Sequence, residues 1–277
     1  MTDDDPGQLA RLAARREIQA LRIEAIDEID VVRIANYHRL FIEDGGVIGA
    51  EGRSVTEGSA GIIRVRPDIT QLARRRFVIA HEIGHCLLHQ TGSVRPCSEG
   101  DLFRYEDGNR EAEANWFAAE LLMPARLFRR YCDTTPEPSF TAIADAARAC
   151  HTTLTATAIR FVQLTAEPCA LVWSEAGKVK WVVKSPDCPG WIDRDRPLNG
   201  YSHAADVFAG KPVPAGFQPV PQRAWFAGNV GGGRDVMEET RSFTRLGAAL
   251  SLVWLPTERD SDDDERDTDA VDVRWRH

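Results

Sequence analysis

The sequence predicts an α+β fold: a mainly helical domain with a small β-sheet, then a helical segment, then a C-terminal domain built on β-strands. Three observations predict it. Apolar residues recur at helical spacing from Leu9 to Leu40, a stretch rich in glycine and β-branched residues follows at 41–68, and the alternating "CALVWSEAGKVKWVVKSP" begins at Cys169. With 277 residues, 43% of them hydrophobic, the chain can bury a substantial core.

The N-terminal elements follow from these patterns in order. The first stretch predicts two helices flanking "DEID", and the second predicts a short β meander that ends in the strand "GIIRV". A long helix is expected from about Leu72 to His89. After a loop containing Pro96 and Gly100, "NREAEANWFAAELLM" predicts a further helix that stops at Pro124.

The C-terminal half changes character after "TTPEPS". There "FTAIADAARACHTTLTATAIRFVQL" predicts a helical stretch, and the alternating segment predicts a hairpin with its turn at "EAGK". "RAWFAG" and "LSLVWLP" are taken as further β-structure of the same domain. The predicted limits are a first domain at 1–133, a helical segment at 134–166, a C-terminal domain at 167–256 and a disordered acidic tail at 257–277.

Composition excludes some classes of protein. The formal net charge is −8, the tail supplies much of the acidity, and no basic block gives the electrostatic footprint of a nucleic-acid binder. The start "MTDDDPG" is acidic where a signal peptide is basic, and no apolar run approaches the roughly 20 residues of a membrane span. We therefore expect a cytoplasmic protein with no membrane contact. Six scattered cysteines form no C-x-x-C pair, which indicates reduced, structural thiols.

The stretch "AHEIGHCLLH" carries the strongest chemical signal. His81 and His85 lie one helical turn apart on the same face, and Glu82 projects beside them, which is the H-E-x-x-H geometry of zinc peptidases. The alternative is a buried helix whose histidines only pack. A catalytic zinc site needs a third protein ligand, and the metzincin pattern is excluded because Leu88 and Thr91 stand at its required positions.

The second helix offers three glutamates, Glu111, Glu113 and Glu120. On a helical wheel Glu111 shares the apolar face with the helix's alanines and leucines, whereas the other two lie on the opposite side. A carboxylate in an apolar stripe is costly unless a cation is near it, so Glu111 is the predicted ligand, with Asn115 one turn on as a hydrogen-bonding partner. We expect zinc, with manganese as a substitute in assays. We expect His89, one turn beyond His85, to support the ligands without binding the metal, or to pack, because a catalytic zinc already has its three protein ligands.

Together, "RRRFVIAHEIGHCLLH" and "EAEANWFAAELLMP" resemble the ImmA/IrrE family of bacterial metallopeptidases, over about Val31 to Arg130. The resemblance implies a zincin-like domain with a thermolysin-type, gluzincin-like site: His81, His85 and Glu111 as metal ligands and Glu82 as the general base. It also implies cleavage of a helix-turn-helix (XRE-type) repressor, which derepresses stress, DNA-damage or mobile-element genes. The arrangement resembles members with a helix-turn-helix-like segment and a C-terminal α/β GAF-like sensor or docking domain.

Two other functions remain open. A DNA-binding regulator would use residues 139–165 as a helix-turn-helix, but the second helix, "LTATAIRFVQL", has one arginine and no lysine, so direct DNA binding is not expected. A ligand sensor would keep the metal only for structure. The presence of Glu82 argues against a sensor, because a structural site needs no general base.

Overall fold

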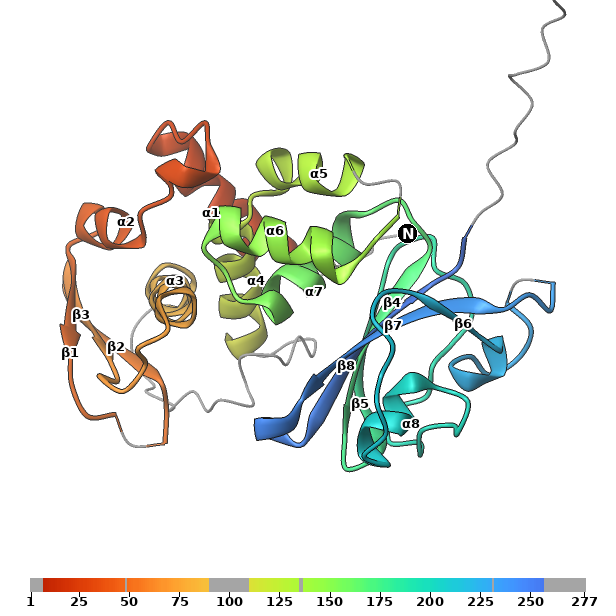
Figure 1. Ribbon diagram of the computed structural model, residues 1–277. Helices are drawn as coiled ribbons and strands as arrows, with labels where there is room; N and C mark the ends of the chain where they lie inside the picture. The colour runs from red at the N-terminus through yellow and green to blue at the C-terminus, as the bar shows by residue number, and fades with distance from the viewer. Residues whose placement is uncertain (1–6, 48, 90–109, 135–136, 231, 257–277) are drawn as a thin grey trace, which may run out of the picture.

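The structure is a computed structural model, and it describes residues 7–47, 49–89, 110–134, 137–230 and 232–256. These residues form eight α-helices and two β-sheets, so the predicted α+β class is confirmed. The two sheets lie at opposite ends of the molecule, and most of the helices lie between them (Figure 1). The acidic tail, Cys97 and the loop containing Pro96 and Gly100 lie outside the described residues.

The first helices surround the acidic stretch at 27–30, as predicted. Asp30 begins the second one, because its carboxylate accepts hydrogen bonds from the backbone N–H groups of Val32 (2.8 Å) and Arg33 (3.2 Å) and so caps the helix. The elements are α1 (Gln8–Ala20), the 3₁₀ helix η1 (Ile26–Glu28) and α2 (Val31–Tyr37).

The small sheet does not have the predicted connectivity. Its strands are β1 (Leu40–Asp44), β2 (Gly52–Glu57) and β3 (Ala60–Val65), in the order β1-β3-β2. Because β1 runs parallel to β3 and β2 antiparallel to it, the prediction of a simple meander is wrong. The apolar β3, in which Ile63 and Val65 are fully buried, takes the centre, where both of its edges are paired. Within the described residues, the strand "GIIRV" therefore has no free edge, and β1 and β2 are the outer strands of this sheet.

The helices that carry the two motifs form as predicted, and one glycine lets them approach closely. They are α3 (Leu72–Leu88) and α4 (Arg110–Leu122), followed by α5 (Ala125–Asp133). At Gly84 of α3, a Cβ atom would lie 3.0 Å from the Phe117 side chain of α4, so a larger residue there would require Phe117 to shift.

Salt bridges fix α3 on the small sheet. Arg74 bonds to Glu51, just before β2, at 2.9 Å, and Arg75 bonds to Asp44, at the end of β1, at 2.7 Å. Two arginines of the basic run "RRR" therefore join the helix to the small sheet and its loops.

The predicted helical stretch is a pair of helices, α6 (Phe140–Cys150) and α7 (Leu154–Leu164). Ser139 and Thr153 cap them by accepting hydrogen bonds from backbone N–H groups, each at 3.2 Å. Between them His151 adopts a left-handed conformation (φ 51°), which ends the first helix. α7 then packs against the C-terminal sheet.

The C-terminal sheet is antiparallel throughout, in the order β5-β4-β8-β7-β6. Its hairpin is confirmed, with Ala176 and Gly177 at positive φ in the turn. The prediction of a strand at "RAWFAG" is wrong, because the chain turns there in the 3₁₀ helix η3. Trp225 is fully buried, and its indole N–H donates a hydrogen bond to Glu238 at 2.8 Å. The elements are β4 (Cys169–Glu175), β5 (Lys178–Lys184), α8 (His203–Phe208), β6 (Gln218–Val220), η3 (Gln222–Ala224), β7 (Val236–Phe243), the 3₁₀ helix η4 (Thr244–Leu246) and β8 (Ala248–Trp254).

Both faces of this sheet are covered. Leu171 and Trp173 of β4 belong to the hydrophobic cluster that includes the helices, whereas Ala170 and Val172 belong to a second cluster that includes Ala204 of α8. The first cluster runs without interruption across the predicted limit at 166/167. The domain limits stay predictions. None of the helices in the described part of the chain has the length and apolar character that a bilayer span requires.

The cysteines of the described residues are all free thiols. Burial raises the pKa of Cys132 and of Cys150 to about 12, and that of Cys188 to about 11. Thiols with such pKa values are protonated at neutral pH, so these three side chains act as small apolar core residues.

Candidate metal centre

Two histidines of α3 and one glutamate of α4 converge. The Nε2 atoms of His81 and His85 lie 2.9 Å apart, and Glu111 Oε2 lies 3.3 Å from the first and 3.4 Å from the second. A tetrahedral ion about 2.0–2.1 Å from each ligand atom would separate neighbouring ligands by about 3.3 Å. Among the described residues, this is the one group of three side chains able to hold a metal ion.

Asn115 determines which nitrogen of His81 faces the cluster. Its Oδ1 lies 2.9 Å from His81 Nδ1, so the imidazole donates from Nδ1 and leaves the lone pair of Nε2 towards His85 and Glu111. His81 is 1% exposed and Asn115 is fully buried. The sequence predicted Asn115 beside the ligands, and the structure places it on His81. The donor set and the fixed tautomer both suit a metal ion.

Glu82 lies next to this cluster, beneath β2. Only 2% of it is exposed, and its Oε2 accepts a hydrogen bond of 2.7 Å from Ser54 Oγ, which lies on β2. The structure therefore places a buried carboxylate on the residue that follows His81 in α3, bonded to the neighbouring strand. The sequence does not single out Ser54, because no local pattern indicates which residue of a strand contacts α3.

Glu113 and His89 lie at the margin of the cluster. His89 Nδ1 is 3.5 Å from Glu113 Oε2, and its Nε2 donates to the backbone oxygen of Arg110 at 3.1 Å. Burial is the main cause that lowers the pKa of His89. The Glu113 side chain is 37% exposed, as expected for a solvated charge. His89 is therefore bonded to α4 and is not one of the three converging side chains.

Glu120 departs from the single apolar face that the helical wheel assumed. It is 1% exposed and forms ion pairs with Arg160 of α7 and, at 2.8 Å, with Arg15 of α1. Because α4 packs on α1 as well as on α3, nearly its whole circumference is buried. The sequence alone does not identify Arg15 and Arg160 as partners of Glu120, because they lie 105 and 40 residues from it in the chain.

Arg160 bears directly on the DNA-binding alternative. It is the one arginine of α7, and it is 4% exposed, with its guanidinium on Glu120 and on the backbone oxygen of Met123 at 3.0 Å. A DNA phosphate would reach this charge only if the ion pair broke. The geometry thus disfavours α7 as a recognition helix.

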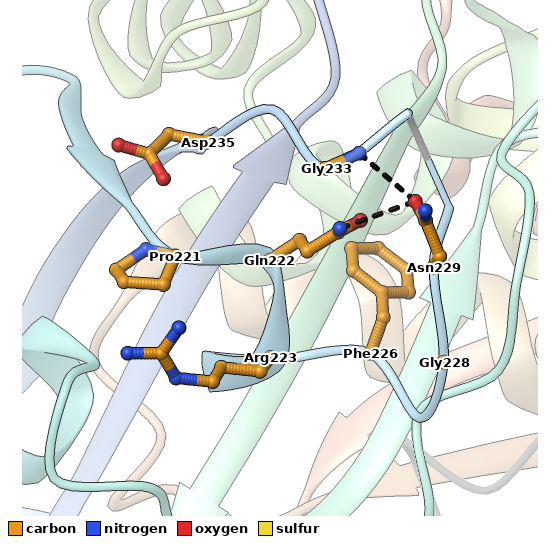
Figure 2. A pocket seen from close by; sticks show the side chains of 8 residues that line it. All are labelled: Pro221, Gln222, Arg223, Phe226, Gly228, Asn229, Gly233 and Asp235. Atoms are coloured by element: carbon orange, nitrogen blue, oxygen red, sulfur yellow. Dashed lines mark hydrogen bonds between the residues drawn. The ribbon is translucent and has the colours of Figure 1, made fainter.

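An open pocket of about 370 Å³ lies in the C-terminal part of the molecule, where the loop after η3 passes close to the start of β7 (Figure 2). Its polar side chains bond mainly to the surrounding chain. Gln222 donates to Asn229 Oδ1 at 3.2 Å and accepts from the backbone of Val230 at 2.9 Å, and Gly233 N donates to Asn229 Oδ1 at 3.0 Å. These bonds shape the loop, and the pocket shares no residue with the metal centre.

We expect Glu111→Ala to weaken zinc binding by at least about tenfold and Glu113→Ala to leave it nearly unchanged, because only Glu111 reaches both histidines. Competition with a fluorescent chelator gives the affinity of each variant. If Glu113→Ala loses the metal and Glu111→Ala keeps it, the assignment of the third ligand is wrong.

Comparison with known proteins adds three findings. The family model of Peptidase M78, the IrrE N-terminal-like domain, matches residues 37–143. The "Uncharacterized immunity region protein 2" of Bacillus phage phi105 is 40% identical over 62 residues, which are 22% of this chain and 38% of the phage protein. A solved "Mycobacterium tuberculosis transcriptional regulator" matches with a TM-score of 0.56 and 16% identity, covering 89% of this chain and 88% of that one.

These likenesses differ in what they establish. The family match contains both motif helices, and it confirms the resemblance to ImmA/IrrE over that segment. The likeness to the solved structure extends over most of the chain and, at this identity, concerns the fold alone. The alignment with the phage protein spans about two fifths of that protein's length.

Proposed function

Residues 37–143 carry an IrrE N-terminal-like domain, and from this premise we propose that the chain is a metal-dependent endopeptidase that cleaves a helix-turn-helix (XRE-type) transcriptional repressor. The observation that carries the proposal is the convergence of His81, His85 and Glu111 with a buried Glu82 beside them. Cleavage of the repressor would release stress, DNA-damage or mobile-element genes from repression.

The donor set favours zinc. Two imidazole nitrogens and one carboxylate oxygen match the three protein ligands of catalytic zinc sites, which keep one position open; manganese is a substitute to be tested in vitro. When bound, the ion would acidify a water molecule and polarise the peptide carbonyl. Asn115 holds His81 in the tautomer that such a site requires.

Glu82 supplies the proton transfers. In this proposal its carboxylate takes a proton from the water that attacks the carbonyl carbon, and then delivers that proton to the nitrogen as the C–N bond breaks. Burial beneath β2 keeps the group in a site where bulk water does not compete for its hydrogen bonds. A site that held the metal only for structure would not need this carboxylate.

The edge of the small sheet offers a place for the substrate. β2 pairs with β3 on one side, and within the described residues no strand pairs with its other side. An extended peptide could add there as a further strand and bond mainly through its backbone. Ser54 lies on this edge strand and donates a hydrogen bond to Glu82 of α3.

The repressor as substrate is supported by context. One relative is described as an immunity region protein of a phage, and we take a repressor as the substrate from this description together with the family match. A peptidase that acts on cellular proteins must select few substrates. A folded repressor provides more docking surface for this selection than a short peptide does. DNA binding as the main function has less support, because Arg160 is buried in an ion pair.

The test is incubation of the zinc-loaded protein with a purified helix-turn-helix (XRE-type) repressor, sought first among the products of the genes beside its own. We expect one discrete cut, found by mass spectrometry of the fragments, no digestion of casein or of an unrelated repressor, and loss of the cut in EDTA with recovery on added zinc. Digestion of casein at many positions would indicate a general peptidase. Tight binding of operator DNA at physiological salt without any cut would favour a regulator.

A further inference from the structure

One hydroxyl bonds to the general base of the proposed reaction. Ser54 Oγ donates to Glu82 Oε2 at 2.7 Å, from a strand to a helix that are 28 residues apart in the chain. Along β2, residues 52, 54 and 56 are less exposed than 53, 55 and 57, so Ser54 lies on the face turned to α3. The contact thus joins the edge strand to the catalytic helix.

We propose that Ser54 is a positioning residue that holds the Glu82 carboxylate in one orientation; this inference rests on the proposed function. A glutamate side chain has three rotatable torsions, and a base in a proton transfer must lie within hydrogen-bond reach of the attacking water. The bond from Ser54 engages Oε2 and leaves Oε1 to accept from that water. A small displacement of the base lowers the rate of the chemical step more than it lowers the affinity for the substrate.

The neighbouring glycine makes the approach possible. At Gly52 a Cβ atom would lie 2.5 Å from Val78 Cγ1 and 3.1 Å from both Cγ and Oε1 of Glu82. The backbone of β2 therefore touches the Glu82 side chain directly, with no room for a larger residue. Gly52 packs against the stem of the glutamate and Ser54 bonds to its head.

The chemistry of the two groups determines the direction of this hydrogen bond. An ionised carboxylate has no hydrogen to donate and only accepts, so the single hydrogen of the Ser54 hydroxyl goes to Glu82.

The experiment compares Ser54→Ala, Ser54→Thr and Ser59→Ala. We expect Ser54→Ala to lower kcat on the repressor by about 10- to 100-fold with KM within about twofold, and Ser54→Thr, which keeps the hydroxyl, to restore kcat to within about threefold of the original. Ser59→Ala makes the same chemical change in the exposed turn of the same hairpin and should alter neither value. Zinc content should stay at about one ion per chain in all three variants.

A second readout needs neither metal nor substrate. In EDTA, Ser54→Ala should lower Tm by a few degrees, because it leaves a buried carboxylate without its donor, and should have almost no effect in a Glu82→Ala background. Equal shifts of Tm in both backgrounds, an unchanged kcat for Ser54→Ala, or loss of zinc from that variant would each overturn the proposal. If the original protein cuts no repressor, the proposed function fails, while the Tm comparison still decides whether Ser54 holds Glu82.

Discussion

Glu82→Gln is expected to lower repressor cleavage by about two to four orders of magnitude while the protein keeps its metal. Glutamine has the shape of glutamate and can still accept the hydrogen bond from Ser54, but it takes up no proton at neutral pH. The loss should therefore fall on the chemical step. Single-turnover rates with the purified repressor measure it, and elemental analysis measures the zinc that remains.

Glu113→Gln is the matched control. Glu113 lies on the neighbouring helix near the same centre, yet its carboxylate contacts His89 and is more than one third exposed. The same chemical change there should leave the rate within about twofold of the original. Undiminished cleavage by Glu82→Gln would refute the assignment of the base. Loss of zinc in that variant would show that Glu82 holds the metal site together.

Arg160→Met should lower the free energy of unfolding by about 3–5 kcal/mol, because it leaves the Glu120 carboxylate buried without its main partner. The ion pair joins α4, which carries Glu111, to α7, which packs on the C-terminal sheet. Urea unfolding in EDTA, at neutral pH, gives the free energy without the contribution of a metal. The effect should appear as a lower midpoint with an unchanged slope.

Arg15→Met removes the other arginine of the same carboxylate. The Arg15 side chain is 48% exposed, so its ion pair should contribute at most about 1 kcal/mol. Glu120→Leu added to Arg160→Met should recover much of the lost stability, since the unpaired charge is gone. Equal losses for the two arginine variants would contradict the claim that burial decides the strength of this pair.

The sequence by itself determined the helices that carry the candidate site. The spacing of His81 and His85 places both on one face of any α-helix, whatever it packs against, and the apolar periodicity predicts α3 and α4 with nearly the bounds observed. Glu111 could be preferred to Glu113 for the same local reason. The structure brings Glu111 and not Glu113 to the histidines, while the roles of these residues stay predictions until metal binding is measured.

Tertiary structure decided what depends on distant partners. The order β1-β3-β2 makes β1 and β2, and not β3, the outer strands, because strand pairing is set by which apolar strand the fold buries at the centre. Because α4 packs on two sides, Glu120 is buried, and the two arginines that form ion pairs with it come from α1 and α7. Ser54 meets Glu82 across 28 residues for the same reason. Periodicity reports which face of an element is buried, and it carries no information about which residues of another element lie opposite.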